Sequence, residues 1–285
     1  MSTAVLITHT HPENSSEAVT AAFEAAKRAG VDLYAPADEH EKHGSAAEGI
    51  GRAEELEGDP DVCVVLGGDG SILYGLRRYA GTGVPVFGIN FGTVGFLAAV
   101  ERQELDEGLR LAFAGEFDRM TLPGLDAQLP GGPRIAMNDV SFARRPHGRV
   151  AELSYRVGSE EVGHVRCDGL VAATPQGSTG YNLANAGPIL AWGVEGYVVS
   201  FIAPHTLTAR ALVVAPDDPL TVQNAAGRDP VDVHIDGEHV CELAPGDGIA
   251  VSFRDGAGVL AQLPGASFYV RLREKFGRLA QWPPT

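Results

Sequence analysis

The sequence predicts an α/β N-terminal domain of the doubly wound kind, an all-β sandwich C-terminal domain, and a C-terminal helix that returns to the first domain. Strand-like and helix-like segments alternate over the first third of the chain, as in parallel sheets covered by helices. After about residue 117, short β-rich runs follow one another between Gly, Pro and Asp turns. Helical composition returns near the end. We therefore expect residues 1–117, with 264–285 packing back on them, to form one domain and residues 118–263 the other.

The elements of the first domain are predicted from apolar runs and from the glycine and polar residues between them. The expected strands are residues 4–8, 31–34, 62–66 and 84–89, and the expected helices are residues 17–29, 71–79 and 104–114. The run Val-Cys-Val-Val-Leu at 62–66 is unbroken and apolar, which is typical of a strand covered on both faces. Residues 36–52 are polar and contain glycine, so we expect a mobile surface segment there.

The second domain is predicted from short β-rich runs. They are residues 135–142, 152–157, 169–173, 212–214, 220–223, 231–235 and 249–253. A long helix-compatible segment is expected around residues 181–190. Residues 268–279 are expected to form the returning helix, with Val270, Leu272 and Phe276 as its apolar positions. Many short strands with turns between them favour a sandwich.

Composition limits the possible partners. The formal net charge is −15 and only three residues are lysine; such an acidic surface is expected in a very salty cytosol, where repulsion is screened and carboxylates hold water. Nucleic-acid binding needs a basic footprint, so it is excluded. No apolar run reaches the length of a membrane span and the start lacks a signal peptide, so a cytoplasmic location is predicted.

Cys63, Cys167 and Cys241 are too few and too scattered for a disulfide framework or metal pair. We expect the first two to be buried.

The sharpest local signal is Gly67-Gly68-Asp69-Gly70-Ser71, placed between a strand and a helix. The glycines let a ligand approach the backbone closely, and N–H groups at a helix N-terminus attract anions. Ser71 either caps the helix or donates to a phosphate oxygen. An aspartate is unfavourable in a phosphate cradle unless it accepts a proton or helps to hold a metal. The competing interpretation is a tight turn with Asp69 exposed.

Missing motifs narrow the enzyme class. The chain has no Gly-x-x-x-x-Gly-Lys-Ser/Thr motif and no lysine near Asp69 in the sequence. Walker-type NTPases and protein kinases are therefore excluded, since both rely on a phosphate-binding lysine. No His-Glu-x-x-His motif or Cys/His cluster is present, so no protein-held metal is predicted.

The glycine turn resembles the Gly-Gly-Asp-Gly-Thr signature of the NAD kinase family, shared in looser form with diacylglycerol-type lipid kinases and 6-phosphofructokinases. Further segments resemble those of NAD kinases in the same order along the chain. They are Gly88-Ile89-Asn90-Phe91-Gly92-Thr93-Val94-Gly95-Phe96-Leu97, Asn138-Asp139, Asp168-Gly169-Leu170, Thr174-Pro175-Gln176-Gly177-Ser178-Thr179-Gly180-Tyr181, Gly187-Pro188-Ile189, Pro204-His205-Thr206-Leu207-Thr208-Ala209-Arg210 and Asp236-Gly237. One such match is weak evidence, and this many in the same order are strong evidence.

The resemblance implies a fold of the NAD kinase/diacylglycerol kinase type and an enzyme that makes NADP. A phosphoryl group would pass from ATP, or from polyphosphate, to the adenosine 2′-hydroxyl of NAD, with Asp69 orienting that hydroxyl and accepting its proton. Gly68, Gly70 and Ser71 would hold phosphate, and Mg²⁺ would arrive with ATP. The resemblance to the family also implies a homodimer or homotetramer. Together with the acidic composition, it predicts that the protein comes from a halophilic archaeon.

The same resemblance implies the contacts to NAD. Asn138 and Asp139 would hold the ribose on the nicotinamide side, in keeping with the ability of amide and carboxylate groups to bind paired hydroxyls. Asp168, Thr179 and Tyr181 would contact the adenine and nicotinamide portions. The contact strip continues through Gly180, Asn182 and Ala184.

Some positions leave alternatives open. Arg166 occupies a basic position of the family and either meets the pyrophosphate or pairs with a nearby carboxylate. Ser71 replaces the usual threonine and keeps the hydroxyl. Gln176 and Gly180 replace the usual Thr/Ser and Ala, which is expected to widen the base pocket or shift the preference between NAD and NADH. Glu238 stands where many members have glutamine.

Two other functions stay in competition. A lipid or sugar kinase would share the glycine turn, but a lipid kinase does not need the Asn138-Asp139 and 174–181 segments, and its membrane-facing surface would be basic or apolar. A non-catalytic NAD(P)(H)-binding regulator on the same fold is supported by the substitutions at Gln176, Gly180 and Glu238. The retained Asp69 argues against it.

Overall fold

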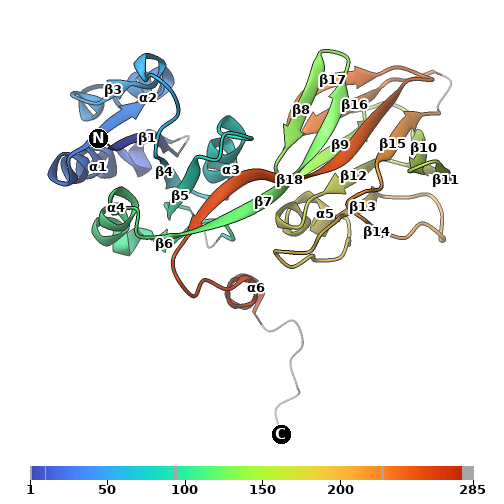
Figure 1. Cartoon of the computed structure of the whole chain (residues 1–285). Helices are drawn as coiled ribbons and strands as arrows, with labels where there is room; N and C mark the ends of the chain where they lie inside the picture. The colour runs from blue at the N-terminus through green and yellow to red at the C-terminus, as the bar shows by residue number, and fades with distance from the viewer. Residues whose placement is uncertain (1, 10, 93–94, 226–227, 278–285) are drawn as a thin grey trace, which may run out of the picture. The chain divides into compact units, whose positions relative to one another are not determined.

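The computed structural model describes residues 2–9, 11–92, 95–225 and 228–277 (Figure 1). The chain divides into two compact units, unit 1 with residues 1–121 and 258–285 and unit 2 with residues 122–257. Two long strands, β7 (Asp118–Leu129) and β18 (Gly248–Gln262), contain residues of both units.

Unit 1 is built on a parallel sheet. In the order β3-β2-β1-β4-β5-β18, neighbouring strands are hydrogen-bonded in parallel, and β6 adds to β5. The strands are β1 (Ser2–Thr8), β2 (Val31–Ala35), β3 (Gly51–Arg52), β4 (Val62–Gly67), β5 (Pro85–Asn90) and β6 (Val100–Glu101). The helices are α1 (Ser16–Ala29), α2 (Ala37–His43), α3 (Asp69–Arg78), α4 (Leu105–Ala114) and α6 (Phe268–Phe276).

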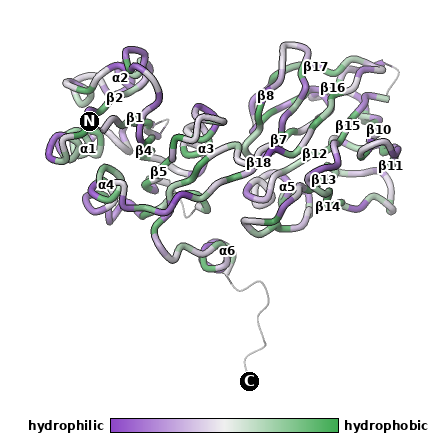
Figure 2. The backbone as a smooth tube through the Cα atoms, viewed as in Figure 1, coloured by the Kyte–Doolittle hydropathy of each residue, from purple (hydrophilic) through white to green (hydrophobic). Residues whose placement is uncertain are grey.

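Helices cover both faces of this sheet. Leu6, Val64 and Phe87 belong to one buried cluster with apolar residues of α1 and α4. On the other face, α3 packs so closely that a Cβ on its Gly75 would lie 3.2 Å from the side chain of Val65. Figure 2 shows hydrophobic and hydrophilic residues alternating along the turns of α1 and α4, as expected of helices with one face on a core. The predicted doubly wound domain is confirmed.

Unit 2 is a β-sandwich. One sheet has the order β14-β13-β12-β9-β16-β17, with antiparallel neighbours throughout. The other contains β11-β10-β15-β18 with β7 and β8. The bounds are β8 (Gly132–Ala136), β9 (Asp139–Arg144), β10 (Ala151–Val157), β11 (Glu160–Cys167), β12 (Gly169–Ala173), α5 (Tyr181–Ala184), β13 (Tyr197–Ile202), β14 (Leu212–Val214), β15 (Leu220–Asn224), β16 (Val231–Ile235) and β17 (Glu238–Leu243). Inward residues of both sheets, such as Phe142 and Val222, share one core, so the predicted sandwich is confirmed.

Residues 36–52 differ from the prediction. Instead of a mobile segment they form α2 and β3, because their polar side chains find partners inside unit 1. The Glu39 carboxylate accepts hydrogen bonds from the Thr8 N–H (3.0 Å) and hydroxyl (2.6 Å). Thr8 Oγ1 also lies 2.7 Å from His43 Nε2, and burial lowers the pKa of His43. Polarity on its own does not separate a surface loop from a satisfied buried network.

Three predicted elements have different bounds. The run 135–142 breaks into β8 and β9 around Asn138. The predicted helix at 181–190 ends at Ala184, because Asn182 bonds to the backbone on both sides of it. Helix α6 ends at Phe276, and Leu279 lies outside the described residues. Within α6, Leu272 is buried as predicted, whereas Val270 and Phe276 are about two-fifths exposed, at 41% and 40%.

Two smaller predictions concern the cysteines and the membrane. Cys63 and Cys167 are buried, and burial raises the pKa of the Cys167 thiol to about 12. Among the described residues, no helix combines the length and the apolar character needed to span a bilayer.

Candidate active site

The glycine turn of unit 1 leads directly into helix α3. The helix begins at Asp69, two residues earlier than predicted, and Gly68 is its N-cap. The Gly68 carbonyl accepts N–H bonds from Ser71 (3.0 Å) and Ile72 (3.1 Å). The N–H groups of Asp69 and Gly70 lie in the first turn, where no acceptor exists within the helix. These amides, together with the helix dipole, suit an anion such as phosphate.

The Asp69 carboxylate is held by the backbone of a distant segment. Its Oδ2 accepts the N–H of Phe96 at 2.8 Å and its Oδ1 accepts that of Leu97 at 3.0 Å. Gly95 allows this approach, since a Cβ there would lie 2.1 Å from Oδ1. The side chain is 33% exposed, and Nζ of Lys275 lies 3.8 Å from Oδ2. Asp69 is therefore fixed in orientation while remaining accessible.

In unit 2, Asp236 organises the segment that carries Asn138 and Asp139. Asp236 and Gly237 connect β16 and β17 with positive φ angles of 49° and 81°, the backbone that a two-residue Asp-Gly hairpin requires. The Asp236 carboxylate accepts the N–H groups of Met137 (3.0 Å), Asn138 (2.6 Å) and Asp139 (3.0 Å). Three bonds to one carboxylate explain why the predicted strand breaks here.

Asp139 is a buried polar residue, and Asn138 is partly buried. Among the described residues, Oδ1 of Asn138 is buried and has no hydrogen-bond partner. Asp139 is 6% exposed; burial first, and then the charge of Asp236, raise the pKa of Asp139 to about 7. Tyr181 is 42% exposed, and after burial the charges of Asp139 and Asp168 raise the pKa of its phenol. The fold thus brings these predicted residues together.

The 174–188 segment is held by its own polar side chains. Thr174 Oγ1 donates to the Met137 carbonyl at 2.8 Å, and the buried Gln176 amide donates to the carbonyl of Pro123 at 2.6 Å. Gln176 therefore supports the backbone of this segment through its side-chain amide. The Asn182 amide donates to the Ser178 and Pro188 carbonyls at 2.9 and 3.0 Å.

The other members of the strip lie at the surface or near it. Gly180, Tyr181 and Ala184 are exposed, Thr179 is partly buried, and Asn182 is fully buried. Thr179 Oγ1 donates to the Gln176 carbonyl at 3.2 Å. Side-chain contacts with a ligand are therefore open to Thr179 and Tyr181, while the amide hydrogens of Asn182 are used within the loop.

Comparison with known proteins identifies the family. The model of the ATP-NAD kinase N-terminal domain matches residues 8–117 and that of the ATP-NAD kinase C-terminal domain matches residues 137–258. A curated NAD kinase of Symbiobacterium thermophilum is 35% identical over 233 residues, covering 78% of this chain and 82% of that protein. One of Desulforamulus reducens is 34% identical over 216 residues, covering 73% and 74%. This chain belongs to the NAD kinase family.

Solved structures agree on the fold of this NAD kinase family member. Yeast NADH kinase in complex with NADH superposes with a TM-score of 0.86 at 20% identity, covering 100% of this chain and 90% of the other. An NAD kinase from Archaeoglobus fulgidus in complex with ATP gives a TM-score of 0.69 at 24% identity, covering 97% and 98%.

Two predicted residues have acidic or basic partners that the sequence did not reveal. Arg144 binds both carboxylate oxygens of Asp168, with Nε at 2.6 Å from Oδ1 and a terminal nitrogen at 3.3 Å from Oδ2. Arg166 pairs with Glu152 at 3.3 Å, which is the second of the two alternatives left open for it.

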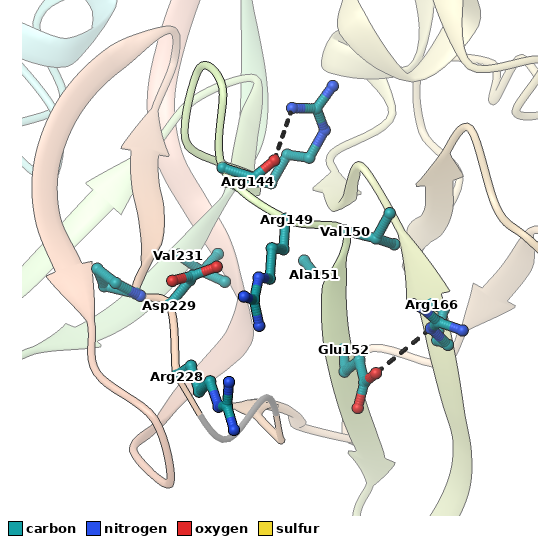
Figure 3. Close-up of a pocket in the computed structure, with 11 residues that line it drawn as sticks. Arg144, Arg149, Val150, Ala151, Glu152, Arg166, Arg228, Asp229 and Val231 are labelled. Atoms are coloured by element: carbon teal, nitrogen blue, oxygen red, sulfur yellow. Dashed lines mark hydrogen bonds and ion pairs between the residues drawn. The ribbon is translucent and has the colours of Figure 1, made fainter.

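Arg166 also lines the pocket drawn in Figure 3, together with Arg144, Arg149, Arg228 and Glu152. The pocket has a volume of about 600 Å³ and lies within unit 2. In the described part of the chain, Arg149 and Arg228 have no ion-pair partner. A guanidinium group can form bidentate hydrogen bonds with phosphate. This pocket is therefore suited to an anion, although the protein as a whole is acidic.

The turn offers few ligands to a metal ion. In the residues that the structure describes, no group of three or more His, Cys, Asp or Glu side chains is arranged to hold one. A Mg²⁺ ion at Asp69 would take most of its ligands from donor phosphates and water, as Mg²⁺ usually does in phosphoryl-transfer sites.

Proposed function

We propose that this chain transfers a phosphoryl group from ATP or polyphosphate to the 2′-hydroxyl of the adenosine ribose of NAD, giving NADP. The bond from the terminal phosphorus to its leaving oxygen breaks as a bond to the 2′-oxygen forms. The hydroxyl proton passes to Asp69. Family membership supports the reaction, and the relatives solved with NADH and with ATP support the two substrate classes.

The observation that carries the role of Asp69 is its fixed, one-third-exposed carboxylate at the N-terminus of α3. From the described residues each oxygen accepts one backbone N–H bond, which leaves a lone pair for a hydroxyl proton. A ribose hydroxyl is a weak nucleophile at neutral pH, and a positioned base speeds its reaction. Most of the acceleration would come from alignment and from neutralising phosphate charge.

The donor would be held by the glycine turn. We assign Gly68, Gly70 and Ser71 to its phosphates, by backbone N–H groups and a hydroxyl. Bound Mg²⁺ would neutralise the donor's charge, and Asp69 is the residue of this turn able to coordinate it.

NAD would be held by unit 2. Asn138, with its unpartnered Oδ1, and Asp139 would bind ribose hydroxyls. Asp168 and Tyr181 would contact the bases. Arg166, which is paired with Glu152 in the structure, would exchange that carboxylate for the pyrophosphate at the arginine-lined pocket. The remaining predicted contacts are Thr179, Gly180 and Ala184, together with Asn182, which would act by holding the loop since it is fully buried.

A non-catalytic NAD(P)(H)-binding regulator is the second candidate. It is favoured by the backbone bonds to both oxygens of Asp69, which equally suit a purely structural aspartate. A lipid kinase ranks below it, because the net charge of −15 opposes binding to anionic membranes.

The deciding experiment measures NADP⁺ after incubation with Mg²⁺, NAD⁺ and either ATP or polyphosphate, in molar salt. We expect NADP⁺ with at least one donor, and a loss of at least about a hundredfold in kcat for Asp69→Asn. Binding of NAD⁺ without any NADP⁺ from either donor would favour the regulator. A kcat for Asp69→Asn within about tenfold of the wild type would refute the role of Asp69.

We further propose that the protein acts in the cytoplasm of a halophilic cell as a homodimer or homotetramer. The acidic, lysine-poor composition supports the salty cytoplasm, and family membership supports the oligomer. Activity that rises with salt, and sedimentation of a species two or four times the monomer mass, are the expected results.

A further inference from the structure

Lys275, in the last turn of α6, lies beside Asp69. Lysine occurs at only three of the 285 positions, yet Nζ of Lys275 is 3.8 Å from Oδ2 of Asp69, with the two side chains 32% and 33% exposed. An ion pair this accessible contributes little to stability. A stabilising role therefore does not explain why one of the few lysines is held at this carboxylate.

Helix α6 is attached to the same backbone that holds Asp69. Arg271 donates to the carbonyls of Phe96 (3.0 Å) and Ala98, and Gln262 donates to the carbonyl of Leu97 at 2.9 Å. The N–H groups of Phe96 and Leu97 point to Asp69. One short segment therefore sets the positions of both the carboxylate and the helix that carries the lysine.

Aromatic contacts direct the ammonium group. The buried ring of Phe96 lies 5.9 Å from that of Phe268 and 5.8 Å from that of Phe276, centroid to centroid. Nζ of Lys275 lies 4.8 Å from the centroid of the Phe96 ring, within the range of cation–π attraction. The ring supports the ammonium on one side and leaves its other N–H donors available to a ligand.

We propose that Lys275 is a catalytic residue that binds the phosphoryl group during transfer, a role that rests on the proposed kinase function. Before the donor binds, its ammonium pairs with Asp69. With the donor in the glycine turn, the ammonium donates to a non-bridging oxygen of the terminal phosphate, and Asp69 accepts the 2′-hydroxyl proton. Lys275 keeps its protons throughout. Transfer breaks the bond to the leaving phosphate oxygen and forms the bond to the 2′-oxygen.

Charge and shape favour lysine in this position. Donor phosphates approach a protein with a net charge of −15, so a local cation is needed to offset repulsion. A compact ammonium on a flexible stem can follow a phosphoryl group as it moves, as phosphate-binding lysines of other phosphotransferases do. Lys275, from the far end of the chain but the same unit, supplies a cation that the sequence around the glycine turn lacks.

The test compares Lys275→Met with Lys27→Met, a matched control in the last turn of α1. We expect Lys275→Met to lower kcat for NADP⁺ formation by about a hundredfold, with the KM for NAD⁺ and the thermal midpoint unchanged. For Lys275→Ala, added ethylamine should restore at least about tenfold of the lost rate. A structural ion pair would not be rescued in this way. A kcat for Lys275→Met within about threefold of the Lys27→Met value would overturn the proposal.

Donor binding separates failure of this inference from failure of the kinase function. Titration calorimetry with MgATP and with tripolyphosphate should show at least about fivefold weaker binding to Lys275→Met than to Lys27→Met. This result would support the lysine even if the wild type made no NADP⁺. Equal affinity in the two variants, or no binding of either donor to the wild type, would overturn it.

Discussion

Replacing Asp139 by asparagine should make the protein more stable at alkaline pH and have little effect at acid pH. The side chain is 6% exposed, and burial followed by the charge of Asp236 raises its pKa to about 7. The unfolded chain has the ordinary value near 3.9. Asparagine keeps the shape and the polarity but carries no charge, so it avoids the cost of ionising a buried carboxyl.

The size and sign of the effect follow from proton linkage. Between about pH 4 and pH 7 the native state binds a proton at Asp139 that the unfolded state has lost, so stability falls as pH rises. The upper limit of this fall is about 4 kcal/mol, from about three pKa units at 1.36 kcal/mol each. The contribution is fully present below about pH 4 and is lost once pH passes about 7. About 3 kcal/mol of it should disappear between about pH 5 and pH 8.

Urea unfolding at a series of pH values in constant salt measures this directly. The free energy of unfolding of Asp139→Asn minus that of the wild type should grow by about 3 kcal/mol from about pH 5 to pH 8. Asp255→Asn is the matched control. Asp255 belongs to the same unit but is exposed, so its carboxyl group is hydrated in the folded state as well as in the unfolded state. Subtracting the two proteins cancels the titration of all other groups.

A flat difference would refute the argument. If Asp139→Asn gained less than about 1 kcal/mol over this pH range, the carboxyl would be solvated or paired in solution. An equal gain in Asp255→Asn would show that general charge repulsion, rather than burial of Asp139, is responsible.

Three further substitutions test the supports of the site. Gly95→Ala puts a Cβ 2.1 Å from Oδ1 of Asp69, so we expect kcat for NADP⁺ formation to fall at least about tenfold, and an unchanged kcat would contradict the positioning of that carboxylate. Asp236→Ala removes the acceptor of three N–H bonds and should cost about 3 kcal/mol in urea unfolding, whereas a loss below about 1 kcal/mol would show that water replaces it. Arg144→Ala frees Asp168 at a site about one-third exposed; the KM for NAD⁺ should rise while stability changes by less than about 1 kcal/mol, and an unaltered KM would argue against Asp168 as a contact.

The sequence alone was sufficient for the fold class and for the residues adjacent to motifs. Unbroken apolar runs such as 62–66 indicate buried parallel strands. The glycine turn indicates the start of a helix, because three glycines in five residues are typical of a tight turn from a strand into a helix. These are local properties, because they depend on residues next to one another in the sequence. The bounds were less predictable where a side chain captures backbone groups, as at Asn138 and Asn182.

Only the tertiary structure decided which distant groups meet. It paired Asp168 with Arg144, gave Asp236 three backbone N–H donors, and buried Glu39 and His43 in a segment whose polarity predicts a loop. No lysine lies near Asp69 in the sequence, and the fold brings Lys275 beside it from the far end of the chain. A motif reflects the chemistry of residues that are close in sequence. Burial, pKa and ion pairing depend on packing between residues that are far apart in sequence.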